Sequence, residues 1–224
     1  MDDTARAKVR FIVGFALFFT VLWLLWNTPF VYPLKIFVVL LHEVSHGIAA
    51  VATGGSIQRI TLDPMEGGAC YCPGGNAFLT LSAGYLGSLL WGGLLLSVAR
   101  TNRIKPEWVN SLIGVLVIGL TLLYVRNGFG IAFGIAFGLA MLAVSKKTGA
   151  GVNRTLLLTL GLTSALYAIL DIKSDIIDRP DVHSDAQMLS EITGIPTLVW
   201  GVLWIAIAIA FSGWLLRRAW REAR

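Results

Sequence analysis

Long apolar runs separated by short polar stretches make up most of the chain. We expect membrane helices at residues 11–30, 33–53, 77–99, 107–124, 129–144, 156–171 and 196–216. A helix rises 1.5 Å per residue, so about 20 residues cross the ~30 Å hydrocarbon layer. The run 129–144 is short for a crossing and could be re-entrant. The pattern predicts an all-α polytopic membrane protein with six to seven transmembrane helices, forming one membrane-embedded domain over residues 1–224.

The stretch 56–76 has a different character from the apolar runs on either side. Residues 56–62 alternate in the manner of a strand, and several Gly and Pro residues follow at turn spacing. The pattern predicts a short β-hairpin or an irregular loop directly after the second apolar run. An exposed strand edge there could pair with an extended peptide, although a plain connecting loop fits the same pattern equally well.

Composition supports the membrane assignment and excludes an ordinary soluble domain. Of 224 residues, 56% are hydrophobic and 14% are charged, and the mean hydropathy is +0.73. The net charge of +5 does not indicate nucleic-acid binding, because the basic residues lie in short loops and at the chain ends, as in membrane proteins. The first apolar run lacks a small-residue cleavage site, so we expect it to remain as a helix.

The candidate chemistry centres on His42-Glu43-Val44-Ser45-His46, within the second apolar run. On a helix, His42 and His46 lie one turn apart on one face, where two imidazoles can bind one metal ion. Glu43 lies beside them, where it can take a proton from a metal-bound water. Two buried histidines that only pack between helices are the plainer alternative, but ionisable groups within a membrane are costly and usually functional. The motif therefore predicts a Zn²⁺ site with Glu43 as its catalytic base.

A catalytic zinc site needs a third protein ligand. His183 is the remaining histidine, and it lies in a polar stretch rich in acidic residues. We expect Asp171 to be the ligand, because it ends an apolar helix and a carboxylate at that depth favours a cation. Asp175 and Asp185 are the alternatives.

Cys70 and Cys72 are the two cysteines of the chain. Two thiols are a weak signal for a second metal site, so we expect them to bind no metal. A disulfide bond across a single intervening residue would be strained.

Five segments together resemble a known family. The chain is similar to the M50 family, the site-2 protease group of intramembrane zinc metallopeptidases, and more closely to its M50B-like branch. The resemblance extends from Leu41 to about Trp204 and rests on LHEVSHGIAA, GGSIQRITLDPMEGG, LSAGYLGSLLWGG, LDIKSD and SDAQMLSEITGIP. It implies one zinc ion bound by His42, His46 and an aspartate, with Glu43 as the catalytic acid/base. The Asn-Pro/Asp-Gly type motif of better-known members is missing, and Leu170-Asp171-Ile172 is its nearest match.

These features predict an intramembrane zinc metalloprotease that hydrolyses membrane-spanning or membrane-associated proteins within the lipid bilayer. We expect it in a bacterial cytoplasmic membrane. Two other interpretations stay open: a binding or regulatory protein of the same fold without hydrolysis, and a transporter with an intramembrane ion site. The orientation is also open. The distribution of Lys and Arg favours an amino terminus outside, whereas the resemblance favours a metal site near the cytosol.

Overall fold

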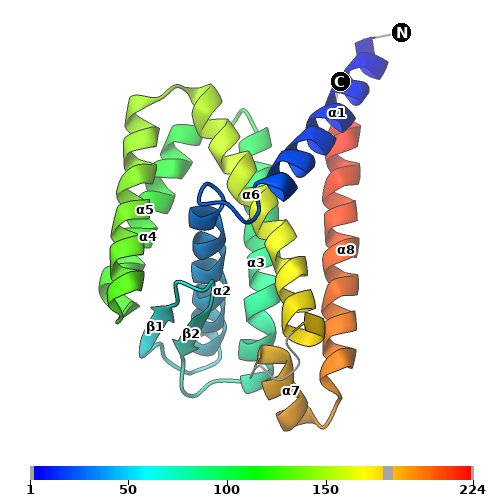
Figure 1. Cartoon of the computed structure of the whole chain (residues 1–224). Helices are drawn as coiled ribbons and strands as arrows, with labels where there is room; N and C mark the ends of the chain where they lie inside the picture. Colours follow the sequence, from blue (N-terminus) through cyan, green and yellow to red (C-terminus); the bar gives the residue numbers. More distant parts are fainter. Residues whose placement is uncertain (1–2, 179–183, 223–224) are drawn as a thin grey trace.

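Helices account for nearly all of the regular structure in the computed structural model, which describes residues 3–178 and 184–222 (Figure 1). The elements in chain order are α1 (Asp3–Leu24), α2 (Tyr32–Ala52), β1 (Arg59–Leu62), β2 (Gly68–Tyr71), α3 (Ala77–Arg100), α4 (Pro106–Tyr124), α5 (Gly128–Lys147), α6 (Ala150–Lys173), a π-helical turn (Ser174–Asp178), α7 (Asp185–Thr193) and α8 (Thr197–Glu222). Within the described residues, six helices are long and apolar enough to cross a membrane: α2, α3, α4, α5, α6 and α8. The predicted fold class, an all-α polytopic membrane protein with a small hairpin, is confirmed.

The first apolar run is shorter as a helix than the expected span 11–30. Helix α1 ends at Leu24, and turns occupy the next seven residues, which include Asn27-Thr28-Pro29. Its apolar part, Ile12–Leu24, falls short of the length needed for a crossing. By contrast, the expected run 129–144 lies within the 20-residue helix α5, so it has the length of a full span.

Helix α6 begins six residues before the expected start at residue 156. Polar Asn153 is accommodated in its first turn because its side-chain amide donates to Thr148 and Gly149, at the end of α5. The amide of Asn110 in α4 donates to the Asn153 side chain at 2.7 Å. The two asparagines are fully buried, and their hydrogen bonds tie together three helix ends.

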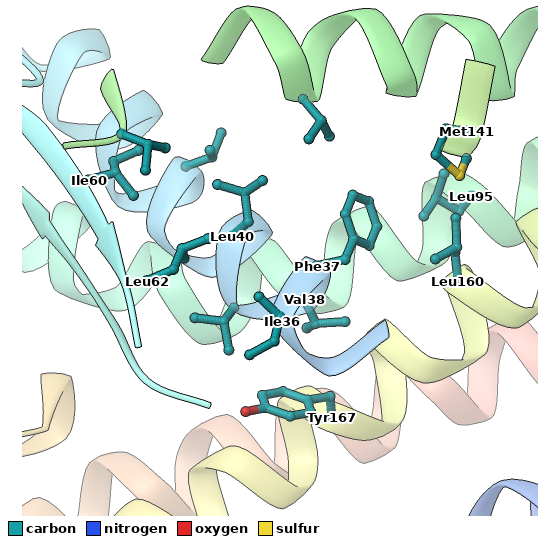
Figure 2. Close-up of a cluster of buried hydrophobic side chains, with 14 of the residues drawn as sticks. Ile36, Phe37, Val38, Leu40, Ile60, Leu62, Leu95, Met141, Leu160 and Tyr167 are labelled. Carbon is teal, nitrogen blue, oxygen red and sulfur yellow. The ribbon is translucent and has the colours of Figure 1, made fainter. Parts of the chain in front are cut away.

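Helix α2 lies at the centre of the bundle. In its most apolar window 67% of the residues are buried, against 22–44% for the other five candidate spans. Five consecutive residues, Ile36 to Leu40, are buried and form the middle of the main core with Ile60, Leu62 and Tyr167 (Figure 2). The helix that carries the two histidines is therefore packed against α3, α6 and the hairpin.

Small residues let α3 pack closely against its neighbours. Gly84, Ser88 and Gly92 are buried along one side of α3, as their four-residue spacing predicts. Ser164 of α6 donates to the Ser88 carbonyl oxygen at 2.7 Å. This packing brings the beginning of α3 and the end of α6 to the histidine turn of α2.

The predicted β-hairpin forms directly after α2. Strands β1 and β2 pair antiparallel, with Ile60 opposite Cys70 and Leu62 opposite Gly68. The outer edge of β1 is covered by the α4–α5 connection, because Arg126 donates its backbone N–H to the Ile60 carbonyl oxygen and the Asn127 side chain bonds both backbone groups of Leu62. Within the described residues no strand pairs with the outer edge of β2, which faces α2.

The turn of the hairpin, residues 63–67, is fixed by side chains of α2 and α6. Lys35, which is 4% exposed, donates to the Glu66 carboxylate at 2.9 Å and lies over the Trp26 ring. Tyr32 donates to the Pro64 carbonyl oxygen at 2.8 Å, and Tyr167 donates to that of Glu66 at 3.3 Å. These contacts fix the position of β2 along the axis of α2.

The Lys35–Glu66 pair gives the first testable prediction. Glu66→Gln leaves a buried ammonium ion without its counter-charge, so we expect it to lower the free energy of unfolding in detergent by about 3 kcal/mol. We also expect faster hydrogen exchange across residues 59–71. The double variant Lys35→Met/Glu66→Gln has no buried charge and should recover most of the loss. A Glu66→Gln variant as stable as the parent chain would show that the pair does not hold the hairpin.

Candidate metal centre

His42 and His46 lie on one face of α2 with ring centres 4.7 Å apart. Both side chains are largely buried, and His46 lies about 9 Å from the end of the helix at 1.5 Å per residue. Gly84 of α3 makes room for the two rings, because a Cβ atom at this position would lie 2.6 Å from His42 Cε1 and 2.6 Å from His46 Nε2.

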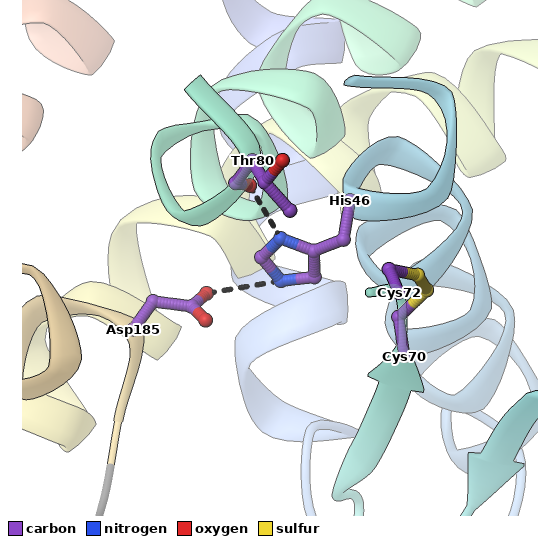
Figure 3. Close-up of a disulfide and its surroundings, with 5 residues drawn as sticks. All are labelled: His46, Cys70, Cys72, Thr80 and Asp185. Atoms are coloured by element: carbon purple, nitrogen blue, oxygen red, sulfur yellow. Dashed lines mark hydrogen bonds and ion pairs between the residues drawn. A yellow bond between two sulfur atoms is a disulfide. The ribbon is translucent and has the colours of Figure 1, made fainter. Parts of the chain in front are cut away.

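Asp185, from the distant helix α7, completes the cluster (Figure 3). One of its carboxylate oxygens, Oδ2, lies 2.9 Å from His42 Nε2 and 3.1 Å from His46 Nε2. The position follows from the start of the helix: Ser184 is the N-cap and accepts from the Gln187 backbone N–H. Asp185 is the next residue, so a short helix places its carboxylate under the histidine turn.

The outer nitrogens of the two rings have partners of their own. His46 Nδ1 lies 2.7 Å from the Thr80 carbonyl oxygen, which can only accept, so Nδ1 carries a hydrogen and Nε2 is the nitrogen that faces Asp185. His42 Nδ1 lies 3.7 Å from Asp171 Oδ2. Asp171, the expected third ligand, therefore lies beside the nitrogen that faces away from the cluster. It is placed to orient the ring of His42.

Asp175, the other alternative ligand that the structure describes, has a hydrogen-bond partner outside the cluster. Asp175 accepts a hydrogen bond from Tyr85 at 2.6 Å, and the Tyr85 ring packs edge-on against His42. His183 and Asp181 lie outside the described residues. The sequence reasoning did not single out Thr80 or Tyr85, because a backbone acceptor has no sequence signature and a tyrosine in an apolar helix is ordinary.

Glu43 lies between the histidine face and the hairpin. It is 5% exposed, and its carboxylate forms a hydrogen bond with the backbone of Cys70 in β2. A Cβ atom on Gly68 would lie 2.7 Å from Glu43 Oε1, so glycine is required for β2 to pass this close. The free edge of β2 therefore runs directly past the carboxylate of the candidate base.

The donor set fits one divalent ion. The ligand atoms of His42, His46 and Asp185 lie within 4.8 Å of one another. Two ligand atoms of a tetrahedral zinc ion, each about 2.0–2.1 Å from the metal, are about 3.3 Å apart, close to the two Nε2–Oδ2 separations. Two imidazoles and a carboxylate leave a fourth position for water, the arrangement of catalytic zinc sites.

The electrostatics of Asp185 agree with this role. Burial raises the pKa of its carboxyl group, but the charges of His46 and His42 and their hydrogen bonds outweigh burial and hold the pKa well below its usual value. The carboxylate is ionised at neutral pH, which is the form that binds a metal.

Cys70 and Cys72 are joined by a disulfide bond (Figure 3). The sequence analysis expects a bridge over one intervening residue to be strained. Residues i and i+2 of a strand point to the same face, and the two Cα atoms are 5.5 Å apart, within the usual range for a disulfide. The bond lies beside the turn of α2 that carries His46.

A polytopic membrane protein with a buried cluster of two histidines and an aspartate is thus the class that fold and site define. The model of the family described as Peptidase M50B-like matches residues 15–215. The chain belongs to this family, and membership suggests a membrane metallopeptidase at family level. Comparisons with curated proteins and with solved structures each gave no match.

The close contact at Gly84 gives a prediction that tests the cluster. Gly84→Ala places a methyl group against both histidine rings, so we expect the affinity for zinc to fall at least about 10-fold while the helical content is kept. Gly119→Ala in α4 is the matched control, since its Cβ would meet nothing within 4 Å. Zinc competition with a chelator on the purified chain measures both. Equal affinity in the two variants would contradict the site.

Proposed function

We propose that the protein is an intramembrane zinc metallopeptidase that hydrolyses peptide bonds of membrane-spanning or membrane-associated proteins. His42, His46 and Asp185 hold the metal, and Glu43 is the catalytic acid/base. The proposal rests on the convergence of two Nε2 atoms and one carboxylate oxygen within 4.8 Å, next to Glu43. Asp185 takes the place of Asp171 in this proposal because it contacts both inner nitrogens, whereas Asp171 faces an outer one.

Each residue has a separate part in the reaction. When bound, zinc lowers the pKa of a coordinated water toward 7 and polarises the carbonyl group under attack. Glu43 accepts the proton of that water and returns it to the leaving nitrogen, so water and one peptide bond become a carboxylate and an amine. The Thr80 carbonyl and Asp171 hold the rings in the orientation that turns both Nε2 atoms inward.

The β2 edge supplies a means to present the substrate. A transmembrane helix hides its carbonyl groups in its own hydrogen bonds, so it must unwind before hydrolysis. In the hairpin register the backbone groups of Gly68 and Cys70 point away from β1, since those of their partners Leu62 and Ile60 bond to the α4–α5 connection. An extended substrate segment paired along this edge would lie beside Glu43.

The assignment of the third ligand is tested by two matched variants. Asp185→Asn removes the charge that contacts both inner nitrogens, so we expect the purified chain to lose zinc, with an affinity more than about 100-fold weaker. Asp171→Asn removes an orienting group, and we expect a loss of about 10- to 100-fold. Zinc content after dialysis against graded chelator separates the two. The reverse order of losses would make Asp171 the ligand.

Glu43→Gln tests the catalytic base. The amide keeps the size of the side chain but cannot accept the proton, so we expect normal zinc content and a rate of cleavage lower by about 100- to 10,000-fold. The assay is the cleavage of a single-span test protein in detergent or proteoliposomes. Cleavage at the parental rate would refute the role. A parent chain that binds zinc and cleaves no single-span protein would favour a binding or regulatory function.

A further inference from the structure

The two ends of the helix bundle differ in how many basic residues they carry. The metal end consists of the connections that contain the hairpin, the α4–α5 turn and α7, namely residues 53–76, 125–127 and 174–196. The opposite end consists of the α3–α4 and α5–α6 connections, residues 101–105 and 148–149, and of the last turns of α8 (Figure 1). Because six helices alternate in direction, the two ends lie on opposite sides of the membrane.

Basic residues gather at the opposite end. Within the first or last turns of the helices there, or in the short connections, the chain carries Arg100, Arg103, Lys105, Lys146, Lys147, Arg154, Arg217, Arg218 and Arg221. Short loops rich in Lys and Arg stay on the cytoplasmic side of a membrane. The distribution of Lys and Arg therefore places the opposite end on the cytoplasmic side of the membrane.

The metal end has few basic residues, and those described have structural partners. Arg59 stacks over the Tyr71 ring at 3.9 Å, and Arg126 donates its guanidinium to backbone carbonyl oxygens at the end of α4. Lys173 also has an interaction partner, and Arg179 lies outside the described residues. Their presence does not offset the excess at the other end.

The Cys70–Cys72 disulfide is a second, independent indication. It lies in the hairpin, at the metal end. Disulfide bonds persist in oxidising compartments and are rare where glutathione and thioredoxin keep thiols reduced. A bond at this position is therefore expected if the metal end faces away from the cytosol.

From the basic residues and the disulfide, we propose that the metal end faces the non-cytoplasmic side of the membrane, opposite to the cytosolic placement that the family resemblance favours. Given the proposed peptidase function, on which this extension rests, the enzyme would cut its substrates in the non-cytoplasmic half of the bilayer or just outside it. The substrate class is then a membrane protein whose unwound segment enters from that side and pairs along β2.

Cysteine labelling of the full chain tests the orientation. Ile195→Cys lies in the α7–α8 connection at the metal end, with a side chain 38% exposed. Gly149→Cys lies in the α5–α6 connection, where a Cβ meets nothing within 4 Å. The native cysteines are bonded to each other, so the parent chain serves as the unlabelled control. A membrane-impermeant maleimide is added to intact cells, and separately to permeabilised cells, without reductant.

We expect Ile195→Cys to react in intact cells and Gly149→Cys to react only after permeabilisation. Reaction of Gly149→Cys in intact cells, or of Ile195→Cys only after permeabilisation, would overturn the orientation. This readout needs no activity, so a chain that labels as expected but cleaves nothing contradicts the peptidase function alone. With a cleaved single-span substrate, mass spectrometry of the products should place the cut in the non-cytoplasmic half of its span. A cut in the cytoplasmic half would refute the proposed route of entry.

Discussion

The contact between α2 and α7 is the interaction on which the rest of the site depends. It brings the Asp185 carboxylate within 2.9 and 3.1 Å of two imidazole nitrogens that lie 143 and 139 positions earlier in the chain. A carboxylate and two imidazoles in an apolar bundle are costly to bury unless they share a partner, and one divalent cation would satisfy all three. The small residues of α3 and the N-cap at Ser184 both serve to bring these groups together.

The hairpin, like the metal cluster, places polar groups inside an apolar bundle, where they need partners. A strand edge inside a membrane domain is costly unless its backbone groups are satisfied. The structure covers the β1 edge with the α4–α5 connection and anchors the turn through Lys35, Tyr32 and Tyr167. The β2 edge remains free of any described strand where it passes Glu43. A strand edge with no strand partner, next to the candidate base and bonded to it at Cys70, suits a surface that receives an extended chain.

Much of this architecture was predictable from local sequence, because the signals are local. Apolar runs give the spans, Gly and Pro spacing gives the hairpin, and His42-Glu43-x-x-His46 gives one face of a helix. The choice between the candidate third ligands was not predictable in this way. Asp171 and Asp185 are both acidic residues near helix ends, and only the packing of α6 against α2 and of α7 against α3 and α8 decides which of them reaches the inner nitrogens. The same holds for the buried hydrogen bonds of Asn153 to neighbouring helices, and for Thr80, which acts through its backbone.

X-ray absorption spectroscopy at the zinc edge of the purified parent chain tests the central claim most directly. The account predicts one zinc ion per chain, bound by two imidazole nitrogens and by oxygen donors at about 2.0–2.2 Å, with no sulfur ligand. A chain purified without chelators that holds no metal, or a zinc ion bound by sulfur or by fewer than two imidazoles, would contradict it.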